Sequence, residues 1–99
     1  MKTLKISDGR VVELRAMGAL ERLRLFKAAG PDLAKNDAWL SMAYVACAAA
    51  AIDGVPLPFP VNELQIEALV GRLGEVTMDE IAHTLSADSE TLELNQLGN

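Results

Sequence analysis

The chain has 99 residues, of which 51% are hydrophobic, and a formal net charge of −5 at pH 7. This length predicts one domain, and the hydrophobic fraction excludes a wholly disordered chain. A single cysteine, Cys47, excludes an intramolecular disulfide framework and is typical of a reducing compartment.

The charges are distributed unevenly along the chain. Residues 1–35 hold eight basic and four acidic side chains, a balance of +4, whereas residues 36–99 hold ten acidic side chains and one arginine, a balance of −9. Two interpretations stay open: the halves neutralise each other within the fold, or opposed faces attract another protomer or a charged partner. Nucleic acid is not an expected partner, because the acidic two-thirds would repel phosphate.

The first element is a predicted β-hairpin over residues 3–14, TLKISDGRVVEL. Two β-prone runs flank Asp8-Gly9, and Asp-Gly between such runs favours a tight turn. An isolated hairpin is marginal in water, so its apolar side chains are expected to pack against a helix.

Residues 16–29 then change to helical spacing. The charged side chains between the apolar positions are expected to face solvent. Gly30-Pro31 is expected to end this helix. Its apolar stripe consists of Met17, Leu20, Leu23 and Phe26.

The central stretch, Ala38 to Ile52, reads AWLSMAYVACAAAAI and contains no charge and seven alanines. We interpret it as a buried helix over 37–52 that is capped by Asn36 or Asp37. At a rise of about 1.5 Å per residue it spans about 22 Å, which is less than the roughly 30 Å of a bilayer core. A helix that is apolar on all sides needs more cover than so small a chain provides, so part of it is expected to face another molecule.

Residues 53–60, DGVPLPFP, contain three prolines and are predicted to be extended. Two interpretations stay open: a strap that lays Val55, Leu57 and Phe59 across the core, or a preformed surface for a partner.

The last elements are two further helices and a tail. Residues 61–73 predict an amphipathic helix capped by Gly74. Thr77 and Glu80 have the spacing of a capping box at the start of a short helix over 78–85. Residues 86–99 lack a long apolar stripe and are expected to be flexible unless a partner orders them.

These elements predict an α+β fold that is mostly α. A hairpin packs on a small bundle of about four helices within a single globular domain, residues 1–85, followed by a flexible tail, residues 86–99. The predicted elements are the hairpin 3–14 and helices at about 16–29, 37–52, 61–73 and 78–85.

No catalytic, cofactor-binding or metal-binding motif is present in the sequence. The only histidine, His83, and the only cysteine, Cys47, lie 36 positions apart and form no motif for a metal or a nucleophile. A helix-turn-helix over 64–85 is disfavoured, because its second helix would hold Asp79 and Glu80 and no basic residue. We therefore expect no enzyme activity, cofactor, small-molecule substrate or membrane partner.

Three segments together resemble a known family: the hairpin ISDGR with the following VVELR, the alanine-rich stretch ending AIDGVPLPFP, and ELQIEALVGRLG. They are similar to the small tail assembly chaperones of long-tailed bacteriophages and prophages, in the branch with a "DGR" turn and a central "IDG-x-P" step. The resemblance covers roughly residues 4 to 84, and its matched pieces are structural rather than catalytic.

The resemblance implies a protein of the bacterial host cytoplasm that is not a component of the mature virion. Such a protein binds the tape measure protein during tail morphogenesis, keeps it soluble and helps to bring tail tube protein to it. In that family a ribosomal frameshift often makes a longer form whose extension engages the tube protein. The alternative is a non-catalytic, homo-oligomeric structural or adaptor protein of a phage or prophage.

A chaperone of a long helical client needs apolar surface, which the uncharged stretch and the proline-rich segment could supply. The sequence therefore suggests five residues for client binding or self-association: Trp39, Met42, Tyr44, Leu57 and Phe59.

Overall fold

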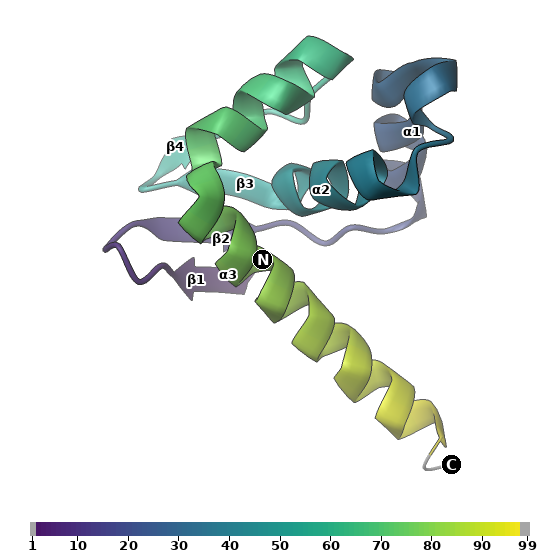
Figure 1. The fold of residues 1–99 in the computed structure, drawn as a ribbon. Helices are drawn as coiled ribbons and strands as arrows, with labels where there is room; N and C mark the ends of the chain where they lie inside the picture. The colour runs from purple at the N-terminus through teal and green to yellow at the C-terminus, as the bar shows by residue number, and fades with distance from the viewer. Residues whose placement is uncertain (1, 98–99) are drawn as a thin grey trace.

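The computed structural model describes residues 2–97, with side chains described for residues 2–87. Four strands form one antiparallel sheet in the order β1-β2-β3-β4, and α3 lies across this sheet (Figure 1). The α+β class is therefore confirmed. The elements are β1 (Lys2–Lys5), β2 (Val11–Leu14), α1 (Ala19–Leu33), α2 (Asp37–Cys47), β3 (Ala49–Ile52), β4 (Val55–Pro56) and α3 (Glu63–Leu97).

The predicted N-terminal hairpin is confirmed as the pair β1-β2, with a register that runs from Lys2 opposite Leu14 to Lys5 opposite Val11. Its connection contains the predicted Asp-Gly, and Gly9 takes a positive φ of 101° that suits a residue without Cβ. The Ile6 side chain within this connection is only 1% exposed, so the turn itself contributes to the core.

The prediction of one helix over 37–52 is wrong beyond Cys47. Asn36 caps α2 as predicted, because its Oδ1 accepts a hydrogen bond from the Trp39 N–H at 3.0 Å. After α2 ends, Ala49–Ile52 forms β3, a central strand between β2 and β4. The unpaired edge of β2 supplies backbone partners for this strand, and this pairing outweighs the helix propensity of alanine.

Asp53 and Gly54 turn β3 into β4, with φ values of 48° and 81°. Two positive φ values are what a two-residue hairpin turn requires, and Ile52 lies directly opposite Val55. The prediction of an extended segment is thus confirmed at Val55–Pro56, which form the edge strand β4. Proline is tolerated on an edge strand because no neighbouring strand needs a hydrogen bond from its backbone nitrogen.

The prediction of about four helices is also wrong, because residues 2–97 contain three. The helices predicted over 61–73 and 78–85 belong to one element, α3, which is interrupted at Gly74 with φ 81° and ψ 168°. The capping box of Thr77 and Glu80 does not form, since Thr77 lies inside α3 and is 0% exposed.

Two further boundaries bear on the predictions. A break at Gly30, with φ 84°, interrupts α1 where the first helix was expected to end, and residues 31–33 add a further turn. The predicted flexible tail, 86–99, begins within α3. Side chains from residue 88 onward and residues 98–99 lie outside the described part of the chain, so that prediction stays a prediction.

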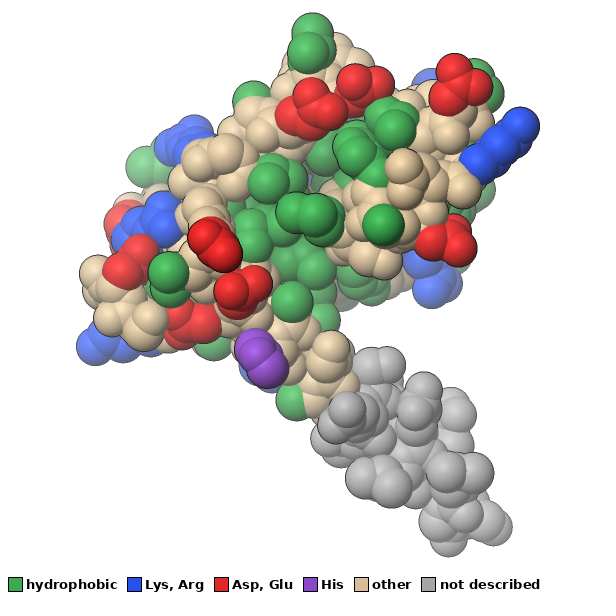
Figure 2. Space-filling model, in the orientation of Figure 1, with side chains coloured by type: hydrophobic (Ala, Val, Ile, Leu, Met, Phe, Trp, Pro, Cys, Tyr) green, Lys and Arg blue, Asp and Glu red, His purple; other side chains and the backbone are tan. Residues whose placement is uncertain are grey.

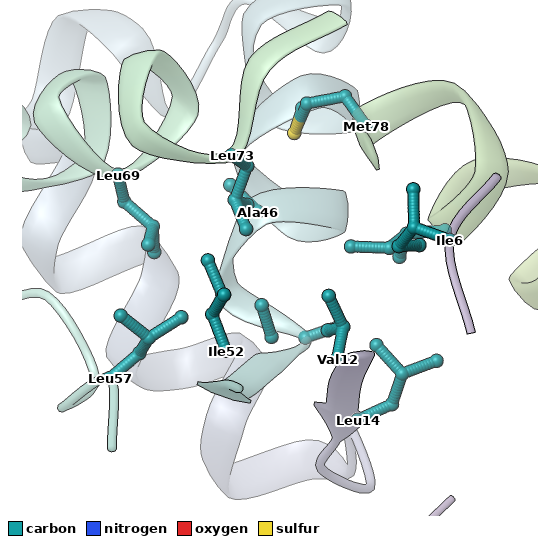
Figure 3. Close-up of a cluster of buried hydrophobic side chains, with 12 residues drawn as sticks. Ile6, Val12, Leu14, Ala46, Ile52, Leu57, Leu69, Leu73 and Met78 are labelled. Carbon is teal, nitrogen blue, oxygen red and sulfur yellow. The ribbon is translucent and has the colours of Figure 1, made fainter. Parts of the chain in front are cut away.

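Most of the buried hydrophobic side chains within residues 2–87 belong to two clusters. The main core lies between the sheet and α3, and Figure 3 shows Val12 and Ile52 of the sheet together with Leu73 and Met78 of α3. The second cluster joins the three helices through Leu25 and Ala28 of α1, Ala43 and Cys47 of α2, and Ile66 of α3.

Arg10 connects the first hairpin to the break in α3. Its Nη2 donates hydrogen bonds to the Leu73 carbonyl at 2.6 Å and to the Thr77 hydroxyl at 2.5 Å. The carboxylate of Glu80 accepts two hydrogen bonds from Ser7, from the hydroxyl at 2.7 Å and from the N–H at 3.1 Å. A helix end leaves carbonyls without N–H partners. At the Gly74 break the guanidinium satisfies two of them, since Nη1 also donates to the Arg72 carbonyl at 3.3 Å.

Replacing Arg10 with methionine is expected to lower the free energy of unfolding by about 1–3 kcal/mol, because the buried Thr77 hydroxyl and the Leu73 carbonyl both lose a charged donor. Urea denaturation measures this change. Lys35→Met, which removes an exposed charge elsewhere, is the control. Equal unfolding midpoints for the two variants would contradict the role of Arg10.

Candidate functional site

An open groove of about 1460 Å³ lies between α1, α2, the end of β2 and the second half of α3. Figure 2 shows hydrophobic side chains gathered between α2 and α3 on one face of the molecule. Leu40 and Tyr44 of α2 form one wall of the groove, and Leu85 of α3 belongs to another. The apolar lining is Leu14, Ala16, Met17, Leu25, Phe26, Leu40, Tyr44, Val45, Ala82 and Leu85.

The predicted apolar stripe faces outward within α1, not into the core, whereas its first member, Met17, precedes α1 and packs against both clusters. Leu20 is 54% exposed and Leu23 is 65% exposed, whereas the buried side of the helix consists of Leu25, Ala28 and Ala29. The small alanines let α1 pack closely against the second cluster. The larger apolar side chains are therefore left on the surface.

Basic side chains lie in the groove and on the exposed side of α1. Arg22 lines the groove, and Arg24 and Lys27 are exposed on α1. The acidic Glu21 is engaged locally, since its Oε1 accepts a hydrogen bond from the Gly18 N–H at 2.9 Å. The groove also contains Asp37. The border as a whole favours a partner that combines apolar and acidic groups.

Arg15 holds the proline-rich segment against the sheet. Its Nη2 donates hydrogen bonds to the Leu57 carbonyl at 2.5 Å and to the Ala49 carbonyl at 3.2 Å. The guanidinium carbon lies 5.3 Å from the centroid of the Phe59 ring, within the range of a cation–π contact. Arg15 also lines the groove, so the groove wall is tied to the core of the fold.

The five residues that the sequence suggested for partner binding lie in three different settings. Trp39, Tyr44 and Phe59 are partly buried and pack against the second cluster. Met42 is 55% exposed on α2, and Leu57 is 4% exposed in the main core. Among the five, only Tyr44 lines the groove.

Partner binding by these residues stays a prediction, and Leu57 could reach a partner only if the core opened. Sequence reasoning missed Phe26, which is 46% exposed and belongs to both the outward stripe and the groove. The helical spacing that contains Phe26 was visible in the sequence. The side of the helix that is buried could not be predicted from spacing alone. Leu25, Ala28 and Ala29, which form the buried side, are spaced as regularly as the exposed stripe.

Cys47 is completely buried, and this burial raises the pKa of its thiol to about 11, opposed in part by the positive charge of Arg15. Within residues 2–87, no group of three or more histidine, cysteine, aspartate or glutamate side chains is placed to hold a metal ion. No helix in the described part of the chain is both long enough and apolar enough to cross a bilayer.

No protein-family model, curated protein or solved structure matches the chain.

We predict that the Cys47 thiol of the folded protein reacts with iodoacetamide at least about tenfold more slowly than in the urea-unfolded chain, because only an accessible thiolate is reactive. Mass spectrometry of timed samples measures this difference. Equal labelling rates in the two states would show that the thiol is accessible.

Stability is also expected to depend on Cys47 at alkaline pH. The unfolded thiol loses its proton near pH 8.5, whereas the folded thiol keeps its proton up to about pH 11. The contribution of this group is therefore fully present below about pH 8.5 and is lost as the pH rises through about 11. Cys47→Ala, titrated in parallel by urea denaturation, should show a smaller loss across this range, and identical curves would contradict the assignment.

Proposed function

We propose that this protein is a phage tail assembly chaperone without catalytic activity that binds apolar helical segments of the tape measure protein in the groove. The observation that carries the proposal is the groove itself, which is open to solvent and walled by apolar side chains from three helices and a strand end. A large exposed apolar surface on a small protein is typical of a site for another protein.

The dimensions and lining of the groove suit a helix rather than a small molecule. An amphipathic helix can place apolar side chains at positions i, i+3 and i+7 against the walls contributed by α2 and α3. Arg22 at the border would attract acidic side chains on the other side of such a helix. This surface therefore matches the apolar, helical client that the sequence resemblance implies.

The remaining parts of the proposal come from the resemblance of residues 4 to 84 to tail assembly chaperones. They are delivery of tail tube protein, activity in the bacterial host cytoplasm and absence from the mature virion. They add a second partner and a cellular location to the proposed binding of the tape measure protein.

Co-expression with the tape measure protein encoded by the same phage or prophage tests the proposal. The wild-type chain is expected to raise the amount of tape measure protein in the supernatant and to co-purify with it. Failure of the wild-type chain to do either would remove the chaperone proposal.

A blocking variant tests whether the groove is the binding site. Ser41 lies on α2 at the groove wall, so Ser41→Trp should obstruct the groove and reduce co-purified tape measure protein at least about tenfold. Met42→Trp is the matched control, because it adds the same side chain at the next position of α2, outside the groove lining. If Met42→Trp were instead the damaging change, the surface suggested by the sequence would be the binding site.

The alternative, a homo-oligomeric structural or adaptor protein without a client, is favoured by the separation of charge along the chain. Such a protein should form the same oligomer whether or not the tape measure protein is present. Sedimentation of the two samples distinguishes this alternative from a chaperone whose assembly state changes with its client.

A further inference from the structure

The outward side of α1 carries apolar and basic side chains and no acidic one. Glu21, the acidic residue in the part of α1 before the Gly30 break, is half-buried and lies on the same side of the helix as Leu25 and Ala28. We name the exposed residues of this part the outer α1 face: Ala19, Leu20, Arg22, Leu23, Arg24, Phe26 and Lys27.

The apolar side chains of the outer α1 face form a stripe between two arginines. Leu20, Leu23 and Phe26 follow one another at every third position and are 46% to 65% exposed. At about 3.6 residues per turn, Arg22 lies along one side of this stripe and Arg24 along the other. Large apolar side chains are therefore uncovered between positive charges.

These positive charges are not neutralised by the part of the chain that the structure describes. Arg22, Arg24 and Lys27 form no ion pair with a residue in that part. Asp32 is exposed near the end of α1, but it follows the Gly30 break and is not part of the outer α1 face. The outer α1 face thus combines unpaired positive charge with uncovered apolar surface.

The position of this face suits a flat, yielding partner better than a protein with side chains to be held in pockets. Leu20, Leu23, Arg24 and Lys27 lie outside the groove lining, and α1 lies at the side of the fold away from the sheet (Figure 1). The strongest contacts of protein partners usually fill pockets. A bilayer surface needs only exposed apolar side chains and complementary charge, and a helix with leucine, phenylalanine and flanking basic residues is typical of that environment.

We propose that the outer α1 face binds the surface of a bilayer that contains anionic lipids. Leu20, Leu23 and Phe26 enter the boundary between headgroups and acyl chains, while the basic side chains extend to the lipid phosphates. The sequence led us to expect no membrane partner because it has no segment that spans a bilayer, but a helix that lies in the interface needs none. This binding does not involve the tape measure protein, so it goes beyond the proposed function.

Co-sedimentation of the purified protein with vesicles tests this proposal. Vesicles of phosphatidylcholine with about 30% phosphatidylglycerol are compared with vesicles of phosphatidylcholine alone. Each basic side chain near an anionic surface strengthens binding about fivefold, so three predict a preference of about a hundredfold for the anionic vesicles at about 0.1 M salt. This preference should largely disappear at about 1 M salt. Equal binding to both vesicles, or binding to neither, would overturn the proposal.

Charge removal tests whether the outer α1 face is responsible. Arg24→Gln with Lys27→Gln should weaken binding to the anionic vesicles about 25-fold. The matched control is Lys5→Gln with Arg72→Gln, which also removes one lysine and one arginine at exposed positions but leaves the outer α1 face intact. It should retain binding within about threefold. Equal weakening by the two double variants would overturn the assignment to α1, and circular dichroism checks that both are folded.

A fluorescent label tests which surface enters the bilayer. Leu23→Cys and Leu64→Cys each replace an exposed leucine, and the native Cys47 is completely buried, so a polarity-sensitive dye attaches at the new position. With anionic vesicles, the emission of the dye on the Leu23→Cys chain should shift to shorter wavelength. The dye on the Leu64→Cys chain, on α3, should not shift. No shift for the first chain, or an equal shift for the second, would overturn the proposal.

Discussion

The pairing of β3 with β2 is the interaction on which the other parts of the fold depend. It ends α2, because the Ala48 carbonyl accepts a hydrogen bond from the Arg15 N–H at 2.8 Å instead of continuing a helix. At the other end of the strand, Asp53 and Val11 exchange two hydrogen bonds of 2.8 Å. The paired alanines add little bulk, so the sheet can lie close to α2 and α3 at its centre.

The break at Gly74 lets α3 contribute to both clusters. Ile66 before the break packs with α1 and α2, whereas Met78 and Ile81 after it pack over the sheet. The change of direction leaves carbonyls without helical N–H partners at the break. Arg10 from the first hairpin donates hydrogen bonds to two of them, those of Arg72 and Leu73, and Glu80 accepts hydrogen bonds from Ser7. The basic N-terminal part and the acidic C-terminal part thus meet inside the fold at a few contacts, and most of their charge stays outside.

The surfaces proposed to act in binding arise from the way the small domain divides its apolar residues. Its inner contacts use alanines wherever helices approach closely, which leaves larger side chains such as Leu23 and Phe26 outside. The groove proposed to bind an apolar helix is lined in part by one of these outer side chains, Phe26.

Local signals in the sequence determined the first hairpin, the Asn36 cap and the breaks at Gly30 and Gly74, because these features depend on a few adjacent residues and on glycine at positive φ. Asp53-Gly54 carried the same turn signal as Asp8-Gly9, but the alanines before it favoured a helix when considered alone. Tertiary structure decided that Ala49–Ile52 is a strand and which side of α1 is buried. It also decided that the Thr77 hydroxyl accepts a hydrogen bond from Arg10 instead of capping a helix. Each of these outcomes depends on a partner distant in sequence, and local propensity and spacing do not specify such a partner.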